Sequence, residues 1–175
     1  MLYGLYKDLL KEYKPENIKI CGSSSGGALA IALSSHINYM NEGIPQPKGM
    51  YLSSPGTFIQ DPKDLQLAKE LSKKDILMDW KYMETAKGFT MADDTPEYMC
   101  VVEKGNYKGL EEVYLCFGQD ECLYAGYNVV KRSFERDGVK VISELGKGLY
   151  HCYPFFPLVN EAKPGWNHMI EYLKS

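Results

Sequence analysis

The sequence lacks the features that would point to a membrane or a nucleic acid. No apolar run approaches the roughly 20 residues that a helix needs to span a bilayer. No basic block is present either, since 20 Lys and Arg against 23 Asp and Glu give a net charge of −3. A chain without a basic patch has no electrostatic attraction for nucleic acid. We therefore expect neither a membrane nor a nucleic acid as a partner.

Signals for export and metal binding are also missing. The segment from Met1 to Asp8 does not show the basic-then-apolar pattern of a signal peptide. The five cysteines are odd in number, and no pair has the spacing of zinc ligands. This usage favours free thiols in a reducing compartment. We expect a cytoplasmic protein that needs no metal and no organic cofactor.

What is present predicts a globular α/β domain. The chain has 175 residues, of which 45% are hydrophobic and 25% are charged, so it can bury a core. Short strands are predicted at 18–21, 49–53 and 113–117, with a last one starting at 139. Helical patterns occupy 2–13, 28–37, 123–134 and 160–174. This alternation predicts a three-layer αβα sandwich around a parallel sheet of about four strands. We interpret 1–175 as one domain and 57–100 as a helical insert within it.

A glycine-framed serine lies between the first strand and a buried helix. The pattern Gly22-x-Ser24-x-Gly26 fits a nucleophile elbow, which requires a strand before it and a helix after it. The glycines would leave space for the tight turn, and the N–H of Ser25 would donate to a developing oxyanion. The alternative is a glycine-rich anion-binding loop. It is disfavoured because the P-loop lysine and the dinucleotide glycine spacing are absent.

A serine nucleophile needs a base and an acid that orients the base. Of the three histidines, His36 and His168 fall on predicted helices, whereas His151 lies in a loop after the last strand. Elbow hydrolases carry their triad in the order Ser, Asp or Glu, His. The turn after strand 113–117 offers Asp120, which we prefer, and the adjacent Glu121 as the alternative acid.

Four segments resemble motifs of the α/β-hydrolase esterases of the hormone-sensitive lipase type, which include bacterial acetyl esterases. They are the elbow Gly22-Ser23-Ser24-Ser25-Gly26-Gly27, the stretch Leu52-Ser53-Ser54-Pro55, the acid turn Gly118-Gln119-Asp120-Glu121-Cys122-Leu123 and the histidine loop Gly148-Leu149-Tyr150-His151-Cys152-Tyr153.

The resemblance implies a carboxylic ester hydrolase for short-chain, acetyl-type esters of small molecules. By position, Ser24 would be the nucleophile, His151 the general base and acid, and Asp120 the orienting acid. Residues 57–100 would contribute to the cap and the acyl pocket. The pocket candidates are Ser23, Phe58, Trp80, Leu123 and Cys152, and further apolar side chains of the insert suit a pocket wall, namely Leu77, Met78, Tyr82, Met83, Phe89 and Met91.

The sequence also departs from that family. Ser23 and Ser25 stand where Asp and Ala are usual, and the upstream H-G-G-G loop that supplies further oxyanion donors is absent. The chain resembles the C-terminal half to two-thirds of such an esterase. Strand 18–21 would then have an open side, so we expect a homo-oligomer or pairing with another chain through this exposed sheet edge.

Three alternative functions stay open at this point. The chain could be a weakly active or inactive hydrolase fragment, or a non-catalytic binding protein on the same fold. It could also be a peptidase or lactonase, because one fold hosts many chemistries. The presence of His151 counts against the binding protein, whose family counterparts have lost this histidine.

Overall fold

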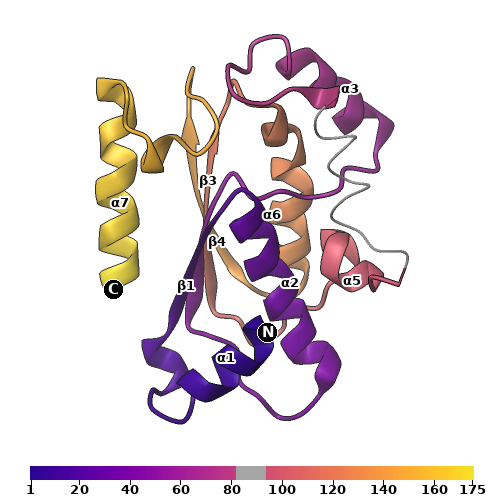
Figure 1. Ribbon diagram of the computed structural model, residues 1–175, viewed down its shortest axis with the longest axis vertical. Coiled ribbons are helices and arrows are strands. Elements are labelled where there is room, and N and C mark those ends of the chain that lie inside the picture. The colour runs from indigo at the N-terminus through magenta and orange to yellow at the C-terminus, as the bar shows by residue number, and fades with distance from the viewer. Residues whose placement is uncertain (82–93) are drawn as a thin grey trace.

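The chain forms a parallel sheet with helices on both faces (Figure 1). The computed structural model describes residues 1–81 and 94–175. The strands are β1 (Lys19–Ser23), β2 (Gly49–Ser53), β3 (Glu112–Gly118) and β4 (Lys140–Gly146), and the helices are α1 (Leu2–Leu9), α2 (Ser25–Met40), α3 (Pro62–Leu71), α5 (Glu97–Cys100), α6 (Tyr127–Arg136) and α7 (Lys163–Lys174).

The four strands lie in the order β1-β2-β3-β4, and every neighbouring pair is parallel. The register places Ser23 beside Ser53, and Ser53 beside Cys116. All four strands therefore end at the same edge of the sheet, where open α/β sheets assemble their sites. The predicted sandwich, with its four parallel strands, is confirmed.

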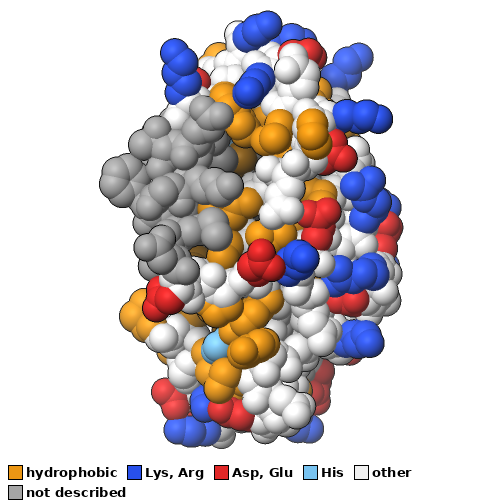
Figure 2. Space-filling model, turned by 90° about the vertical axis from the view of Figure 1, so that its right-hand side faces the viewer, with side chains coloured by type: hydrophobic (Ala, Val, Ile, Leu, Met, Phe, Trp, Pro, Cys, Tyr) orange, Lys and Arg blue, Asp and Glu red, His pale blue; other side chains and the backbone are white. Residues whose placement is uncertain are grey.

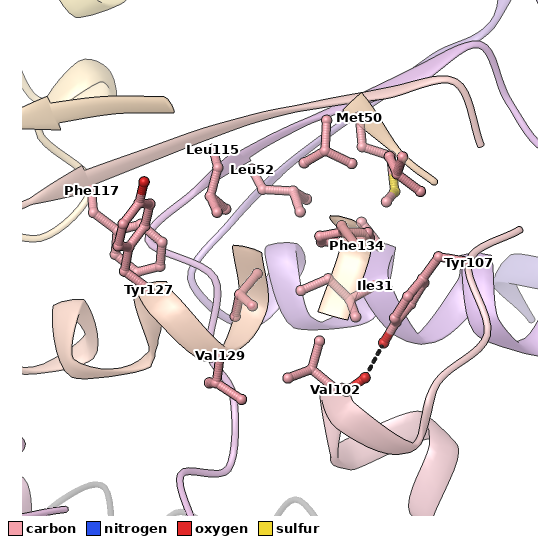
Figure 3. Close-up of a cluster of buried hydrophobic side chains, with 14 of the residues drawn as sticks. Ile31, Met50, Leu52, Val102, Tyr107, Leu115, Phe117, Tyr127, Val129 and Phe134 are labelled. Carbon is pink, nitrogen blue, oxygen red and sulfur yellow. Dashed lines mark hydrogen bonds between the residues drawn. The ribbon is translucent and has the colours of Figure 1, made fainter. Parts of the chain in front are cut away.

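Two apolar layers hold the helices to the sheet. On one face α2 and α6 pack against β2 and β3 through a cluster that includes Ile31, Leu52, Leu115 and Phe134 (Figure 3). On the other face α7 packs through Met169 and Tyr172. Strands buried on both faces carry near-continuous apolar runs, and all five residues of β2 are buried.

The remaining elements follow local signals. Asp61 caps α3, because its Oδ1 accepts the N–H of Lys63 at 2.7 Å, and Pro62 occupies the first helical position. The predicted helix 2–13 ends earlier, at Leu9. Among the described residues, no helix is both long and apolar enough to cross a bilayer.

Candidate active site

The residues of the candidate site come from loops at the carboxyl ends of four neighbouring strands. Ser24 follows β1, Ser54 follows β2, Glu121 lies three residues after β3, and His151 lies in the loop after β4. The parallel topology brings these loops to one edge of the sheet. Segments up to 127 residues apart in sequence thereby contribute to one location.

Ser24 occupies a strained turn between β1 and α2. Its backbone has φ 51° and ψ −121°, which L-residues adopt rarely. The N–H of Ser24 donates to the carbonyl of Ser53, and its own carbonyl accepts from Gly56. Both partners belong to the backbone of β2 or of the segment after it, and they hold the strained turn in place. The conformation is the one that a nucleophile elbow requires.

The glycines of the elbow do not all have the expected role. A Cβ on Gly22 would lie 2.5 Å from the carbonyl oxygen of Gly26, and a Cβ on Gly27 would lie 2.8 Å from Pro55. A Cβ on Gly26 would meet nothing within 4 Å. The expectation that Gly26 is needed for space is therefore wrong. Gly22 and Gly27 are the positions where backbone segments approach too closely for a side chain.

Ser25 is the first residue of α2, so its N–H has no partner within the helix. The helix dipole adds partial positive charge at this end. Ser24 and Ser25 both line a cavity beside the elbow. The N–H of Ser25 is thus placed to donate a hydrogen bond to an oxyanion that forms beside Ser24 in this cavity.

The carboxylate that contacts His151 is that of Glu121. Its Oε2 lies 2.5 Å from Nδ1 of the imidazole, and the Glu121 side chain is fully buried. Among the described residues, no hydrogen bond joins the Asp120 side chain to His151, and the backbone N–H of Asp120 donates to the carbonyl of Leu149 at 3.1 Å. The preference for Asp120 as the acid beside His151 is therefore contradicted by this geometry. The alternative, Glu121, has the contact.

The turn after β3 explains the difference. Backbone bonds from Gln119 to Gly146 and from Asp120 to Leu149 fix these two residues against the loop of β4. Glu121 comes next, and its longer side chain folds back so that Oε1 accepts the N–H of Gly118 at 2.9 Å. The path of the backbone after β3 therefore determines that Glu121 is the acid that contacts His151.

Ser54 contacts both the acid and the histidine loop. Its hydroxyl donates to Oε1 of Glu121 at 2.6 Å and accepts the N–H of Cys152 at 3.1 Å. Ser54 is fully buried and has a positive φ of 46°. With Gly118 and His151 it completes three hydrogen bonds to the Glu121 carboxylate, which satisfies a buried charge.

The second nitrogen of His151 faces Cys152. Nε2 lies 3.3 Å from the Cys152 sulfur, and no hydrogen bond joins His151 to Ser24 in the described part of the chain. Burial lowers the pKa of His151, but hydrogen bonds to Cys152 and Glu121 and the charge of Glu121 outweigh it, so this pKa lies above its ordinary value. The imidazole of His151 therefore keeps its proton to a higher pH than a free histidine does.

An apolar cavity of about 580 Å³ opens beside Ser24, between α2, α5 and the segment after β2. Hydrophobic side chains gather on this face of the molecule (Figure 2). Of the predicted pocket residues, Phe58 and Leu123 line the cavity, as does Met78, whereas Ser23, Trp80, Cys152 and Leu77 do not. The predicted residues Tyr82, Met83, Phe89 and Met91 lie outside the described residues.

The other histidines have partners away from this site. Nδ1 of His36 lies 2.9 Å from the hydroxyl of Tyr98, and Nδ1 of His168 lies 3.2 Å from Glu144. Within 1–81 and 94–175, no group of three His, Cys, Asp or Glu side chains is arranged to hold a metal ion. His151 is therefore the histidine that the fold brings to the elbow edge of the sheet.

Sequence reasoning missed two contacts of this site. Ser54 was part of a predicted motif with no role of its own, and Cys152 was predicted to line the pocket, although its sulfur lies against the imidazole. A signal for Ser54 was available, because a polar residue directly after a buried strand lies at the site edge of a parallel sheet. No local signal indicates the contact of Cys152.

A parallel sheet with a strained serine elbow and a buried Glu–His pair defines the hydrolase class of α/β proteins. The family model described as the alpha/beta hydrolase fold matches residues 3–155, and the chain belongs to this family. Among curated proteins, no relative matches the sequence.

Solved structures with the same architecture are esterases by description. A mutant of the esterase E40 superposes with a TM-score of 0.85 at 20% identity, covering 98% of this chain and 58% of that one. An esterase/lipase from an uncultured bacterium gives 0.82 at 23%, covering 98% and 57%. A hormone-sensitive lipase from a metagenome library gives 0.83 at 21%, covering 98% and 59%. The chain thus spans somewhat more than half the length of these proteins.

Proposed function

We propose that this protein is a carboxylic ester hydrolase for short-chain acyl esters, with Ser24 as nucleophile, His151 as general base and acid, and Glu121 as the acid that orients His151. The observation that carries this proposal is the buried hydrogen bond between Glu121 and Nδ1 of His151, at the same sheet edge that presents Ser24 in a positive-φ turn. A base fixed by a carboxylate beside a strained serine is the arrangement that acyl transfer needs.

In the proposed reaction Ser24 Oγ attacks the ester carbonyl while Nε2 of His151 accepts the hydroxyl proton. The N–H of Ser25 donates to the oxyanion of the tetrahedral intermediate. His151 then gives its proton to the leaving alcohol, and an acyl-enzyme remains on Ser24. Water, deprotonated by His151, attacks this acyl group, and His151 returns the proton to Ser24 Oγ as the bond to Ser24 breaks and the carboxylic acid leaves.

This reaction requires Nε2 of His151 to exchange its contact with the Cys152 sulfur for a hydrogen bond with the Ser24 hydroxyl. Nε2 contacts the Cys152 sulfur at 3.3 Å in the resting structure. Catalytic hydrogen bonds are often long or poorly aligned without substrate and tighten when it binds. The Ser24 hydroxyl can take the place of the Cys152 thiol, because a hydroxyl both donates and accepts a hydrogen bond.

The cavity beside Ser24 is suited to bind an apolar acyl group. Its walls are predominantly hydrophobic side chains, with Ser24 and Ser25 at the elbow and Phe58, Met78 and Leu123 among the lining residues. Each buried methylene contributes about 0.8 kcal/mol. A cavity of about 580 Å³ has room for an acyl chain beyond acetyl. This volume supports the predicted substrate class of short-chain acyl esters, including chains longer than acetyl.

A second candidate function is a weakly active or non-catalytic protein on the same fold. The observation that favours it is that the chain spans 57–59% of the matched esterases. Removing one oxyanion donor costs about 2.7–4 kcal/mol of transition-state stabilisation. A protein that relies on the Ser25 N–H alone would acylate slowly while keeping its nucleophile, base and acid.

The test is hydrolysis of p-nitrophenyl acetate, butyrate and hexanoate by the purified chain, beside Ser24→Ala and His151→Asn. The proposal expects turnover that both substitutions abolish. A stoichiometric burst of p-nitrophenol without turnover would favour the weakly active alternative. Equal rates for the wild type and Ser24→Ala would contradict the assignment of the nucleophile.

A further inference from the structure

Ser54 connects three parts of the site that lie far apart in the sequence. It follows β2, its hydroxyl contacts Glu121 from the turn after β3, and it accepts the N–H of Cys152 from the loop after β4. The next two residues contact the elbow, since Gly56 donates to the carbonyl of Ser24 and Pro55 lies against Gly27. The segment Ser54–Gly56 therefore touches the loops that carry all three proposed groups.

We propose that Ser54 is a positioning residue that fixes the Glu121 carboxylate and the His151 loop relative to each other. This inference rests on the proposed function for its kinetic consequence, but its structural consequence can be measured without any substrate. The hydroxyl both donates to Oε1 of Glu121 and accepts from the backbone beside His151, so one atom constrains both partners.

The backbone of Ser54 is itself held in place for this role. Its φ of 46° is unfavourable for a residue with a Cβ, and its N–H donates to the carbonyl of Cys116 at 2.7 Å. Strain of this kind persists where surrounding bonds over-determine the conformation. The strained backbone directs the Ser54 hydroxyl toward the buried carboxylate.

The neighbouring serine provides a matched control. Ser53 is also fully buried, but its Oγ has no hydrogen-bond partner among the described residues. Ser53→Ala and Ser54→Ala therefore each remove one buried hydroxyl from adjacent positions. Only the second substitution removes hydrogen bonds to Glu121 and to the His151 loop.

The first readout is the pKa of His151, followed through its imidazole NMR signals, which are assigned by their loss in His151→Asn. Ser54→Ala should lower this pKa toward the ordinary histidine value, because the loosened carboxylate stabilises the imidazolium less. Ser53→Ala should keep the wild-type pKa. An unchanged pKa in Ser54→Ala would overturn the inference, whatever the activity.

The second readout is ester hydrolysis. Ser54→Ala should lower kcat about ten- to a hundredfold, the value of a hydrogen bond to a charged group, with little change in KM. If Ser54→Ala does not fold, Ser54→Gly gives the same comparison, because glycine accepts a positive φ. If the wild type hydrolyses no ester but Ser54→Ala still lowers the pKa of His151, the proposed function is refuted and the positioning role of Ser54 is supported.

Discussion

Glu121 holds His151 through a buried hydrogen bond, while the neighbouring Asp120 donates its backbone N–H to Leu149. Glu121→Gln removes the charge that fixes the tautomer of His151 and stabilises its protonated form. In serine hydrolases this loss costs about 10⁴-fold in kcat. We predict a loss of this order for Glu121→Gln in p-nitrophenyl butyrate hydrolysis and a change within a few-fold for Asp120→Asn. Comparable losses in the two variants would contradict the assignment.

The pKa of His151 sets the pH dependence. This pKa is raised in the folded protein, so the neutral imidazole that can accept a proton from Ser24 forms only as pH rises. We predict that log kcat/KM increases with pH through an apparent pKa above the ordinary histidine value of about 6.5. A plateau already reached at pH 6 would contradict this prediction.

Cys152 contributes to the same pKa through its contact with Nε2. Cys152→Ala removes this hydrogen bond, so the acidic limb of the kcat/KM profile should move to lower pH. Cys21→Ala, which changes an exposed thiol on β1, is the control and should leave the limb in place. An identical profile in the wild type and Cys152→Ala would show that the thiol does not act on the base.

At the scale of elements, the elbow joins β1 to α2 through a close approach of Gly22 to Gly26. Gly22→Ala places its Cβ 2.5 Å from a backbone oxygen, which cannot move aside as a side chain could. We predict a loss of about 3 kcal/mol in the free energy of unfolding, measured by urea denaturation.

Gly26→Ala is the matched control, because the space beside Gly26 is open and the residue lies in α2. Alanine is favoured over glycine in a helix, so this variant should be neutral or more stable by up to about 1 kcal/mol. Equal destabilisation of the two variants would contradict the packing described for the elbow.

The order of strands and helices could be predicted because it depends on local patterns. The apolar stretch of β2 and the Asp61-Pro62 cap of α3 each carry their signal within a few residues. The elbow was predictable for the same reason, since Ser24 lies between a strand and a helix that are visible in the sequence.

The choice between two adjacent acids was not predictable from such patterns. It depends on backbone bonds from Gln119 and Asp120 to the loop of β4, which lies more than 25 residues away in sequence. The contact of Cys152 with Nε2 likewise depends on the left-handed backbone at Cys152, with φ 54°. Contacts between distant loops are set by tertiary packing and leave no local signal.

At the scale of the whole molecule, β1 forms one edge of the sheet that the described residues build, and its one strand partner among them is β2. An edge strand presents unpaired backbone groups, which favour pairing with another chain. We predict that the purified protein forms a dimer through β1, with twice the 19.9 kDa of one chain in analytical ultracentrifugation.

Cys21→Lys tests this prediction, because a charged side chain on an edge strand opposes pairing. The variant should sediment as a monomer. Leu158→Lys changes a side chain that is 78% exposed outside β1 and should remain dimeric. A wild type that sediments as a stable monomer would contradict association through this edge.

The most direct measurement of the central claim is intact-mass analysis after incubation with a small fluorophosphonate, which reacts with an activated serine. The account predicts one adduct per chain, located on Ser24 by peptide mapping, absent in Ser24→Ala and strongly slowed in His151→Asn. A wild-type chain that takes up no label, or that carries it on another residue, would contradict the claim that Ser24, His151 and Glu121 form a working site.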